Sequence, residues 1–135
     1  MISNKRTIII VEDDPDTAEM FAEMLRLMGH NVFQVHRGAQ AIGLIAEVKP
    51  SAIILDWKMS DITGLEVMQH IRRDAKLAKI PIIMVSAKNL PSDIELALNS
   101  GASVYLTKPV GYNDLENAIQ KVLEIRSVNY SENQH

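Results

Sequence analysis

The sequence predicts a single α/β domain, a parallel β-sheet with helices packed on both faces. Short apolar runs rich in β-branched side chains alternate with stretches in which apolar residues recur at helical spacing. This strand–helix order repeats five times, which is typical of a parallel sheet covered by helices. The chain has 135 residues, 47% of them hydrophobic and 23% charged, and these values fit one ordinary globular domain.

The five predicted strands are short, and the first is apolar throughout, as expected for a strand that is covered on both faces. They comprise residues 7–11, 31–35, 52–55, 82–85 and 104–106. The run Ile53-Ile54-Leu55 leads directly into Asp56 and is predicted to be the central strand.

The first two helices have clear start and stop signals. Asp14 is a good N-cap and Pro15 suits the first helical position, while Gly29 is placed to end the first helix. The second helix spans residues 38–48 and is stopped by Lys49-Pro50. The apolar faces of these helices comprise Ala18, Phe21, Ala22 and Leu25, and then Ala41, Leu44, Ile45 and Val48.

The three remaining helices are predicted from the same signals. A turn at residues 61–64 precedes the third helix, and Pro91-Ser92-Asp93 opens the fourth, which ends at Gly101. Asn113-Asp114 opens the fifth helix. The residues predicted to face inward are Leu65, Met68 and Ile71, then Ile94, Ala97 and Leu98, and finally Leu115, Ile119, Val122 and Ile125.

Composition narrows the possible functions. The net charge is -3 with no basic block, which argues against nonspecific nucleic-acid binding as the main role. The chain has no cysteine and therefore no thiolate metal site, and no apolar run is long enough for a membrane span. We expect a cytoplasmic domain over residues 5–126, followed by a polar, disordered tail over residues 127–135.

Acidic residues follow two of the predicted strands. Glu12 and Asp13 come after the first strand and Asp56 after the third, whereas Asp14 is explained by its capping role. In an open α/β sheet, sites form beyond the carboxyl ends of the strands. Adjacent strands would bring these carboxylates together, and such a group repels itself unless a cation binds. Oxygen ligands of this kind suit Mg²⁺ or Mn²⁺.

Two further strand ends supply an ammonium and a hydroxyl group. Lys108 follows the last strand and precedes Pro109, so its peptide bond can adopt the cis form. Ser86 follows the fourth strand. A metal, an ammonium group and a hydroxyl around the carboxylate of Asp56 would form a site for a phosphoryl group, with Asp56 as the nucleophile.

The ordered set of these motifs resembles a receiver domain of bacterial two-component response regulators, of the stand-alone kind found in chemotaxis. The resemblance covers residues 5–126, and its one noted departure is Ser60, where the family usually has proline. The motifs that carry it are Ile8 to Asp14, Asp56-Trp57-Lys58-Met59 continuing to Gly64, Val85-Ser86-Ala87, and Tyr105-Leu106-Thr107-Lys108-Pro109. It implies a flavodoxin-like (βα)5 three-layer sandwich with strand order 2-1-3-4-5.

The resemblance also implies the chemistry. Asp56 would accept a phosphoryl group from a sensor histidine kinase or a histidine phosphotransfer protein, and Ser86 and Lys108 would hold the phosphoryl oxygens. The domain would catalyse only its own phosphotransfer and dephosphorylation. The predicted Mg²⁺ ligands are Asp13, Asp56, the backbone carbonyl of Lys58 and, largely through water, Glu12.

Signalling would depend on a second group of residues. The resemblance implies that Ser86 moves inward and lets Tyr105 rotate, which alters the surface formed by the fourth helix, the fifth strand and the fifth helix. This surface would control a downstream protein and could form a homodimer, with no direct nucleic-acid or membrane contact. Lys58 and Lys88 lie two residues after Asp56 and Ser86, and we expect both to tune hydrolysis of the acyl phosphate.

Alternative functions fit the sequence less well. A phosphatase of the haloacid dehalogenase type is disfavoured because Ala18 stands where Thr or Val is expected and the chain has no room for a cap domain. A dinucleotide site is disfavoured because no G-x-G-x-x-G follows the first strand. A pseudo-receiver that only docks remains an alternative, as does a fragment of a longer regulator.

Overall fold

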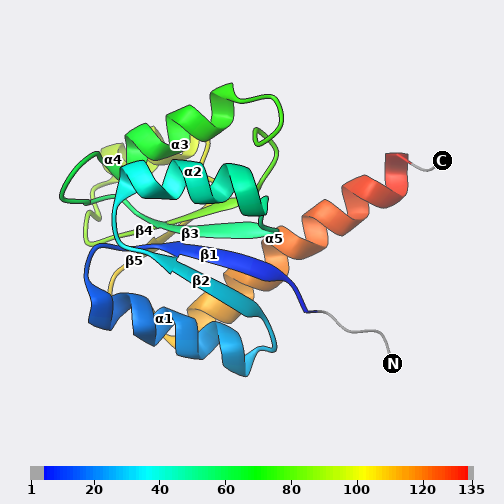
Figure 1. The fold of residues 1–135 in the computed structure, drawn as a ribbon, viewed down its shortest axis with the longest axis horizontal. Helices are drawn as coiled ribbons and strands as arrows, with labels where there is room; N and C mark the ends of the chain where they lie inside the picture. The colour runs from blue at the N-terminus through cyan, green and yellow to red at the C-terminus, as the bar shows by residue number, and fades with distance from the viewer. Residues whose placement is uncertain (1–4, 134–135) are drawn as a thin grey trace.

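The computed structural model describes residues 5–133, with side chains described from residue 5 to residue 124. Five strands and five helices alternate along this part of the chain, as the sequence predicted (Figure 1). Their bounds are β1 Thr7–Val11, α1 Pro15–Leu27, β2 Asn31–Val35, α2 Gly38–Val48, β3 Ala52–Asp56, α3 Gly64–Arg73, β4 Ile82–Ser86, α4 Pro91–Asn99, β5 Val104–Thr107 and α5 Tyr112–Asn133.

The strands form one parallel sheet in the order β2-β1-β3-β4-β5, which confirms the predicted fold class and strand order. Helices α1 and α5 cover one face of the sheet, and α2, α3 and α4 cover the other (Figure 1). The register pairs Val11 with Leu55, Asp56 with Val85, and Ser86 with Thr107. The carboxyl ends of β1, β3, β4 and β5 therefore meet at one edge of the sheet.

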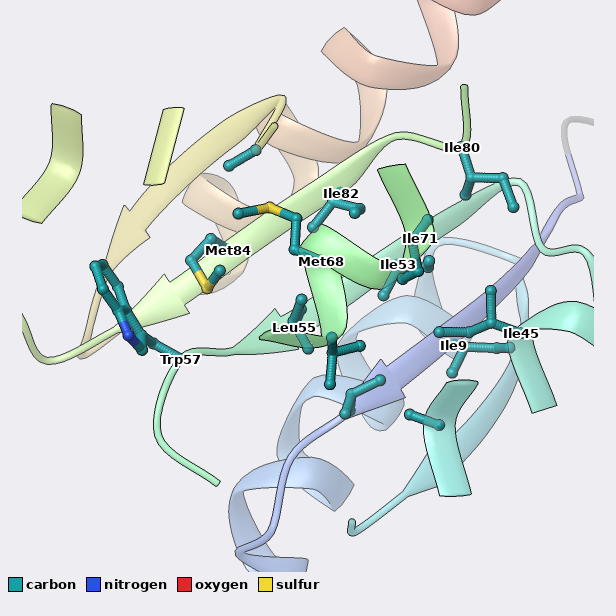
Figure 2. Close-up of a cluster of buried hydrophobic side chains, with 14 of the residues drawn as sticks. Ile9, Ile45, Ile53, Leu55, Trp57, Met68, Ile71, Ile80, Ile82 and Met84 are labelled. Atoms are coloured by element: carbon teal, nitrogen blue, oxygen red, sulfur yellow. The ribbon is translucent and has the colours of Figure 1, made fainter. Parts of the chain in front are cut away.

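Two apolar cores hold these layers together, one on each side of the sheet. Alternate residues along each strand contribute to opposite cores, as in β1, where Ile9 packs toward α2 and α3 while Ile8 packs toward α1 and α5. Figure 2 shows the first core, with Ile80 at one end and Trp57 just beyond the arrowheads of β3 and β4 at the other. Trp57 is buried at the point where this core meets the edge of the sheet.

Local signals at the first and third helices explain where these helices begin. The side chain of Asp14 accepts hydrogen bonds from the backbone N–H and the hydroxyl of Thr17, so Asp14 is the N-cap of α1, as predicted. Gly29, at φ +95°, follows the end of α1 in the left-handed conformation that glycine tolerates. Thr63 forms a capping box with Glu66 at the start of α3.

Helix α4 departs from the predicted inward face. Ala97 is buried as predicted and Ile94 is partly buried, but Leu98 is 44% exposed. The prediction for Leu98 was therefore wrong. Three apolar residues of this short helix, Leu96, Ala97 and Leu98, are consecutive in the sequence. Their side chains therefore point in different directions around the helix axis, and a single buried stripe cannot hold all of them.

Helix α5 continues past the predicted end of the domain at residue 126 as far as Asn133. The backbone from residue 127 to residue 133 is therefore helical, where a disordered tail was predicted. The first half of α5 packs on the sheet through Leu115, Ile119 and Val122, and each residue added to an established helix gains one backbone hydrogen bond. Figure 1 shows the second half of α5 extending away from the sheet. Residues 134–135, and the side chain of Ile125, lie outside the described part of the structure.

Candidate functional site

The predicted site residues gather in one cleft at the carboxyl edge of the sheet. The cleft has a volume of about 810 Å³ and opens above the ends of β1, β3, β4 and β5. Its lining includes every residue proposed from the sequence except Tyr105, namely Glu12, Asp13, Asp56, Lys58, Ser86, Lys88 and Lys108. The structure therefore brings these residues together in one cleft, and the sheet topology explains how they meet.

Two buried carboxylates and one lysine form the centre of the cleft. Glu12 is 1% exposed and Asp56 is 4% exposed. The Lys108 Nζ donates to Glu12 Oε1 at 2.9 Å and to Asp56 Oδ2 at 2.8 Å, so one ammonium group is shared by both acids. The Lys108–Pro109 peptide bond is cis.

Burial and hydrogen bonding shift the pKa values of Glu12 and Lys108. Burial, followed by the hydrogen bond to Asp56, raises the pKa of Glu12 to about 7, although Lys108 acts in the opposite direction. Burial also opposes the charge of Lys108, but its hydrogen bonds to Asp56 and Glu12 outweigh that cost and raise the pKa of the ammonium group. The cleft therefore holds a stable cation and one carboxylate that readily takes up a proton.

Asp13 completes an oxygen cluster that fits a hard divalent cation. One carboxylate oxygen from each of Glu12, Asp13 and Asp56 lies within 4.8 Å of the others. Three carboxylates at this spacing are the ligand type that Mg²⁺ and Mn²⁺ prefer. Asp14 also lines the cleft, but its carboxylate is engaged at the N-terminus of α1, while its N–H donates to Glu12 Oε2 at 3.2 Å.

The far side of the cleft links Ser86 to Tyr105 through the backbone of Lys88. The Lys88 N–H donates to Ser86 Oγ at 3.1 Å, and the Tyr105 hydroxyl donates to the Lys88 carbonyl at 2.7 Å. The ring of Tyr105 also contacts the ring of Trp57 edge-on, with centroids 6.3 Å apart. Burial is the main cause that raises the pKa of the Tyr105 hydroxyl, which keeps it a neutral donor.

Lys58 and Lys88 lie at the mouth of the cleft, as expected, but they are held differently. The Lys58 N–H donates to Asp56 Oδ1 at 3.0 Å, and the side chain is exposed. The Lys88 Nζ lies over the ring of Trp57, 5.0 Å from its centroid, in a cation–π contact. The ammonium group of Lys88 is therefore held over Trp57.

Sequence reasoning missed two residues near the cleft that make contacts with distant parts of the chain. His36 Nδ1 lies 3.0 Å from the carbonyl oxygen of Glu12, and the carboxylate of Asp61 accepts hydrogen bonds from the start of α2. Both contacts join residues more than 20 positions apart, so no local pattern reveals them. The cation–π contact of Lys88 was missed for the same reason.

The cleft combines a buried strand-end aspartate with an acid pair, a lysine and a serine, and comparison with known proteins shows which class of protein this chain belongs to. A family model described as the response regulator receiver domain matches residues 8–120. The chain therefore belongs to the response regulator receiver domain family, whose members are signalling domains of two-component phosphorelays. This membership disfavours the phosphatase and dinucleotide-binding alternatives.

Curated relatives include both short and long proteins. Protein PilH of Pseudomonas aeruginosa is 32% identical over 116 residues, which cover 86% of this chain and 96% of PilH. The phosphate regulon transcriptional regulatory protein PhoB of the same organism is 34% identical, over 87% of this chain and 52% of PhoB. The chain thus spans about half the length of PhoB and nearly all of PilH.

Solved structures resemble the whole domain. A putative response regulator from Chloroflexus aurantiacus J-10-fl superposes with a TM-score of 0.85 at 29% identity, covering 90% of this chain and 99% of that one. The receiver domain of the sensor histidine kinase PA1611 from Pseudomonas aeruginosa superposes with a TM-score of 0.82 at 29% identity, covering 89% and 98%. That structure has a magnesium ion coordinated in its active-site cleft. Among the described residues of the present chain, no helix is long and apolar enough to cross a membrane.

Proposed function

We propose that Asp56 is the phosphoacceptor of this receiver domain and takes its phosphoryl group from a phosphohistidine on a sensor kinase or a phosphotransfer protein. The observation that carries the proposal is the position of Asp56. It is buried at the end of the central strand, in contact with Lys108 and within the same cluster as Glu12 and Asp13. A cytoplasmic site of action is part of this proposal.

Divalent metal fits the acid cluster. Asp13, Asp56 and the backbone carbonyl of Lys58 would hold Mg²⁺ or Mn²⁺, with Glu12 acting largely through water. The donor set consists of hard oxygen atoms, and the structurally similar receiver domain of PA1611 has a magnesium ion coordinated in its active-site cleft. When bound, the metal supplies positive charge that offsets the negative charge of the phosphoryl group.

The residues of the chain have distinct roles in the transfer. A carboxylate oxygen of Asp56 forms a bond to phosphorus while the bond from phosphorus to the donor imidazole nitrogen breaks, and that nitrogen keeps the electron pair. Lys108 and Ser86 would hold the phosphoryl oxygens from two sides. In the reverse direction water attacks phosphorus, the bond from phosphorus to the Asp56 oxygen breaks, and inorganic phosphate leaves. The domain acts on its own aspartate and on no external ester.

The conformational effect of phosphorylation would be transmitted to a partner protein through Ser86 and Tyr105. Movement of Ser86 toward the phosphoryl group would break its hydrogen bond to the Lys88 N–H, and the Lys88 carbonyl is the acceptor for the Tyr105 hydroxyl. The surface affected comprises α4, β5 and α5. It would bind a downstream protein or a second copy of the chain, without direct contact to nucleic acid.

The experiment is phosphorylation by acetyl phosphate in the presence of Mg²⁺, followed by mass spectrometry of the intact protein. We expect the addition of one phosphate, its complete loss in Asp56→Asn, and its retention in Asp14→Ala, a matched acidic residue whose carboxylate caps α1. Undiminished labelling of Asp56→Asn would show that another residue is the acceptor. An unlabelled wild-type protein would instead favour the pseudo-receiver.

Metal binding is tested separately through the fluorescence of Trp57, which follows Asp56 in the chain. Asp13→Ala is expected to weaken Mg²⁺ binding strongly, because it removes one of three clustered carboxylates. Asp14→Ala is expected to have little effect on binding, because that carboxylate is engaged with Thr17. Equal losses in the two variants would mean that the wrong acids have been assigned to the metal.

A further inference from the structure

Asp56 is the last residue of β3, and the other proposed metal ligands lie in two separate loops that are attached to the same part of the chain. The acid loop, residues 12–14, follows β1, and the β3–α3 loop, residues 57–63, carries Lys58. The segment from the last residue of β2 to the first two residues of α2, residues 35–39, contacts both. The Glu12 N–H donates to the Val35 carbonyl at 3.0 Å, and His36 lies 3.0 Å from the Glu12 carbonyl oxygen.

Asp61 makes the corresponding attachment for the β3–α3 loop. Its Oδ1 accepts from the Gly38 N–H at 2.9 Å and its Oδ2 accepts from the Ala39 N–H at 3.0 Å. These are two of the N–H groups that have no partner within a helix at its first turn. Arg37 occupies the N-cap position of α2 without a side-chain cap, so Asp61 supplies the cap from a distant loop.

The path of the β3–α3 loop shows why this attachment matters. The base of the loop is closed, because the Gly64 N–H donates to the Trp57 carbonyl at 2.7 Å. A side chain at Gly64 would meet the backbone oxygen of Asp56 at 2.0 Å, so the two ends of the loop lie against each other. Lys58 leaves the base of the loop and Asp61 lies farther along it. Asp61 therefore limits how the outer part of the loop can move.

The start of α2 and the β3–α3 loop are also closely packed beside Asp61. A Cβ atom placed on Gly38 would lie 2.6 Å from the Ile62 side chain and 3.0 Å from that of Val67. Glycine at position 38 therefore allows the β3–α3 loop to approach the start of α2. Hydrogen bonds from Ala39 and Gly38 hold the pKa of Asp61 at about 2, so its carboxylate is ionised throughout the neutral range.

We propose that Asp61 is a positioning residue for the metal site, which fixes the β3–α3 loop and the Lys58 backbone against the acid loop by binding the N-terminus of α2. The proposal rests on the proposed function, because it assumes that Lys58 and the acid pair bind Mg²⁺. Asp61 itself does not line the cleft. Its effect on the metal would be transmitted through the geometry of the loop rather than through ligation.

The experiment measures the Mg²⁺ dissociation constant by Trp57 fluorescence for the full chain and three variants. Asp61→Ala removes both hydrogen bonds, and Asp61→Asn removes the charge but keeps one acceptor oxygen. Asp74→Ala is the matched control, since Asp74 Oδ1 accepts from the Lys76 N–H at 2.9 Å at the opposite end of α3. Asp61→Ser replaces Asp61→Ala where thermal melting shows that the latter does not fold.

We expect the dissociation constant to rise about fivefold to tenfold in Asp61→Ala, roughly 1 to 1.4 kcal/mol. It should rise clearly less in Asp61→Asn and remain unchanged in Asp74→Ala. The rise should also persist at high salt, since screening weakens a purely electrostatic effect. An unchanged constant in Asp61→Ala would overturn the proposal, as would equal rises in Asp61→Ala and Asp61→Asn that disappear at high salt. A wild-type protein that binds no Mg²⁺ would overturn the proposed function itself.

Discussion

Helices α3 and α4 lie on the same face of the sheet and follow neighbouring strands, yet they are attached very differently. Helix α3 buries Gly64, Val67, Met68 and Ile71 and begins with a capping box. Helix α4 buries Ala97, has no side-chain cap, and leaves Leu90, Leu96 and Leu98 between 44% and 60% exposed. The cleft therefore has a firmly packed metal side, next to α2 and α3, and a loosely packed switch side, next to α4 and β5.

The difference matches the role proposed for each side. A metal site needs carboxylates held in place against their own repulsion, and the contacts of His36 and Asp61 supply this restraint. A switch needs an element that can move at a small cost in free energy, and such elements come from the least stable parts of a fold. On the switch side, the segment after β4 is held at Lys88 by single contacts to Ser86, Tyr105 and Trp57.

Unlike the rest of the switch side, the C-terminal end of α4 is held by several hydrogen bonds. The guanidinium of Arg72, on α3, donates to the Gly101 carbonyl from Nε at 3.0 Å and from Nη2 at 2.8 Å. It also donates to the carbonyls of Ala78 and Ile80. We infer that movement of α4 begins at its N-terminal end, near Lys88, while Arg72 holds the other end in place.

Native-state hydrogen exchange tests the comparison directly and should show the largest effect. Amides of α3 such as Met68 and Ile71 should be protected at least about a hundredfold more than those of Ala97 and Leu98 in α4, roughly 2.7 kcal/mol of local opening free energy. The measurement is amide exchange of the unphosphorylated protein by NMR. Equal protection of the two helices would contradict the division into a firm side and a loose side.

Replacement of Tyr105 should separate the two sides functionally. Tyr105→Ala is expected to leave phosphorylation of Asp56 nearly intact, because Tyr105 does not line the cleft, but to impair the response of a downstream partner. Tyr105→Phe is the matched control. It keeps the ring that contacts Trp57 and loses only the hydrogen bond to the Lys88 carbonyl, about 1 kcal/mol. Phosphorylation and partner response are measured on the same samples, and equal loss of both would assign Tyr105 to the catalytic centre.

The strand-end residues could be predicted from the sequence because they depend on two local facts. Each apolar run ends at a defined residue, and parallel strands place those ends at one edge. The role of Asp14 was predictable for a similar reason, since a cap and its partner Thr17 lie within one turn. These rules place Glu12, Asp13 and Asp56 at the same edge of the sheet, and the strand order implied by the family resemblance makes β1 and β3 neighbours.

The contacts that distinguish the two sides could not be predicted in this way. Asp61 caps a helix that begins 23 residues earlier in the chain, and Arg72 binds a carbonyl 29 residues later. An aspartate in a turn is already explained by the turn, so nothing in the sequence indicates a distant partner. The orientation of Leu98 was missed because α4 has apolar residues at several angles and too few turns for one face to dominate.

The lifetime of the acyl phosphate should depend on the two lysines at the mouth of the cleft. We expect Lys58→Asn and Lys88→Ala each to shorten it, by up to about tenfold or roughly 1.4 kcal/mol of barrier, because both ammonium groups can pair with phosphoryl oxygens and shield them from water. Lys88 must first leave Trp57, at a cost of about 0.5 to 1 kcal/mol, so its effect should be the smaller one. Loss of acyl phosphate is followed over time with excess Mg²⁺ and no phosphodonor, and unchanged or longer lifetimes in both variants would reject this role.

The charge of Glu12 tests whether the metal side is under electrostatic strain without metal. Its pKa of about 7 in the folded chain lies above the ordinary value of 4.5, because burial and the neighbouring Asp56 disfavour its charge despite Lys108. Between these two values the folded chain binds more protons at Glu12 than the unfolded chain does. The contribution of Glu12 to the free energy of unfolding is therefore fully present below pH 4.5 and is lost as the pH rises toward 7.

Urea unfolding in the presence of a chelator, at several pH values from 4.5 to 8, measures this contribution. His30 acts in the opposite direction, since burial lowers its pKa and favours the folded state as the pH rises. The informative quantity is therefore the difference between wild type and Glu12→Gln, which keeps the size of the side chain but cannot ionise. The stability of the wild type relative to this variant should fall as the pH rises, and a constant difference would mean that Lys108 fully compensates the buried charge.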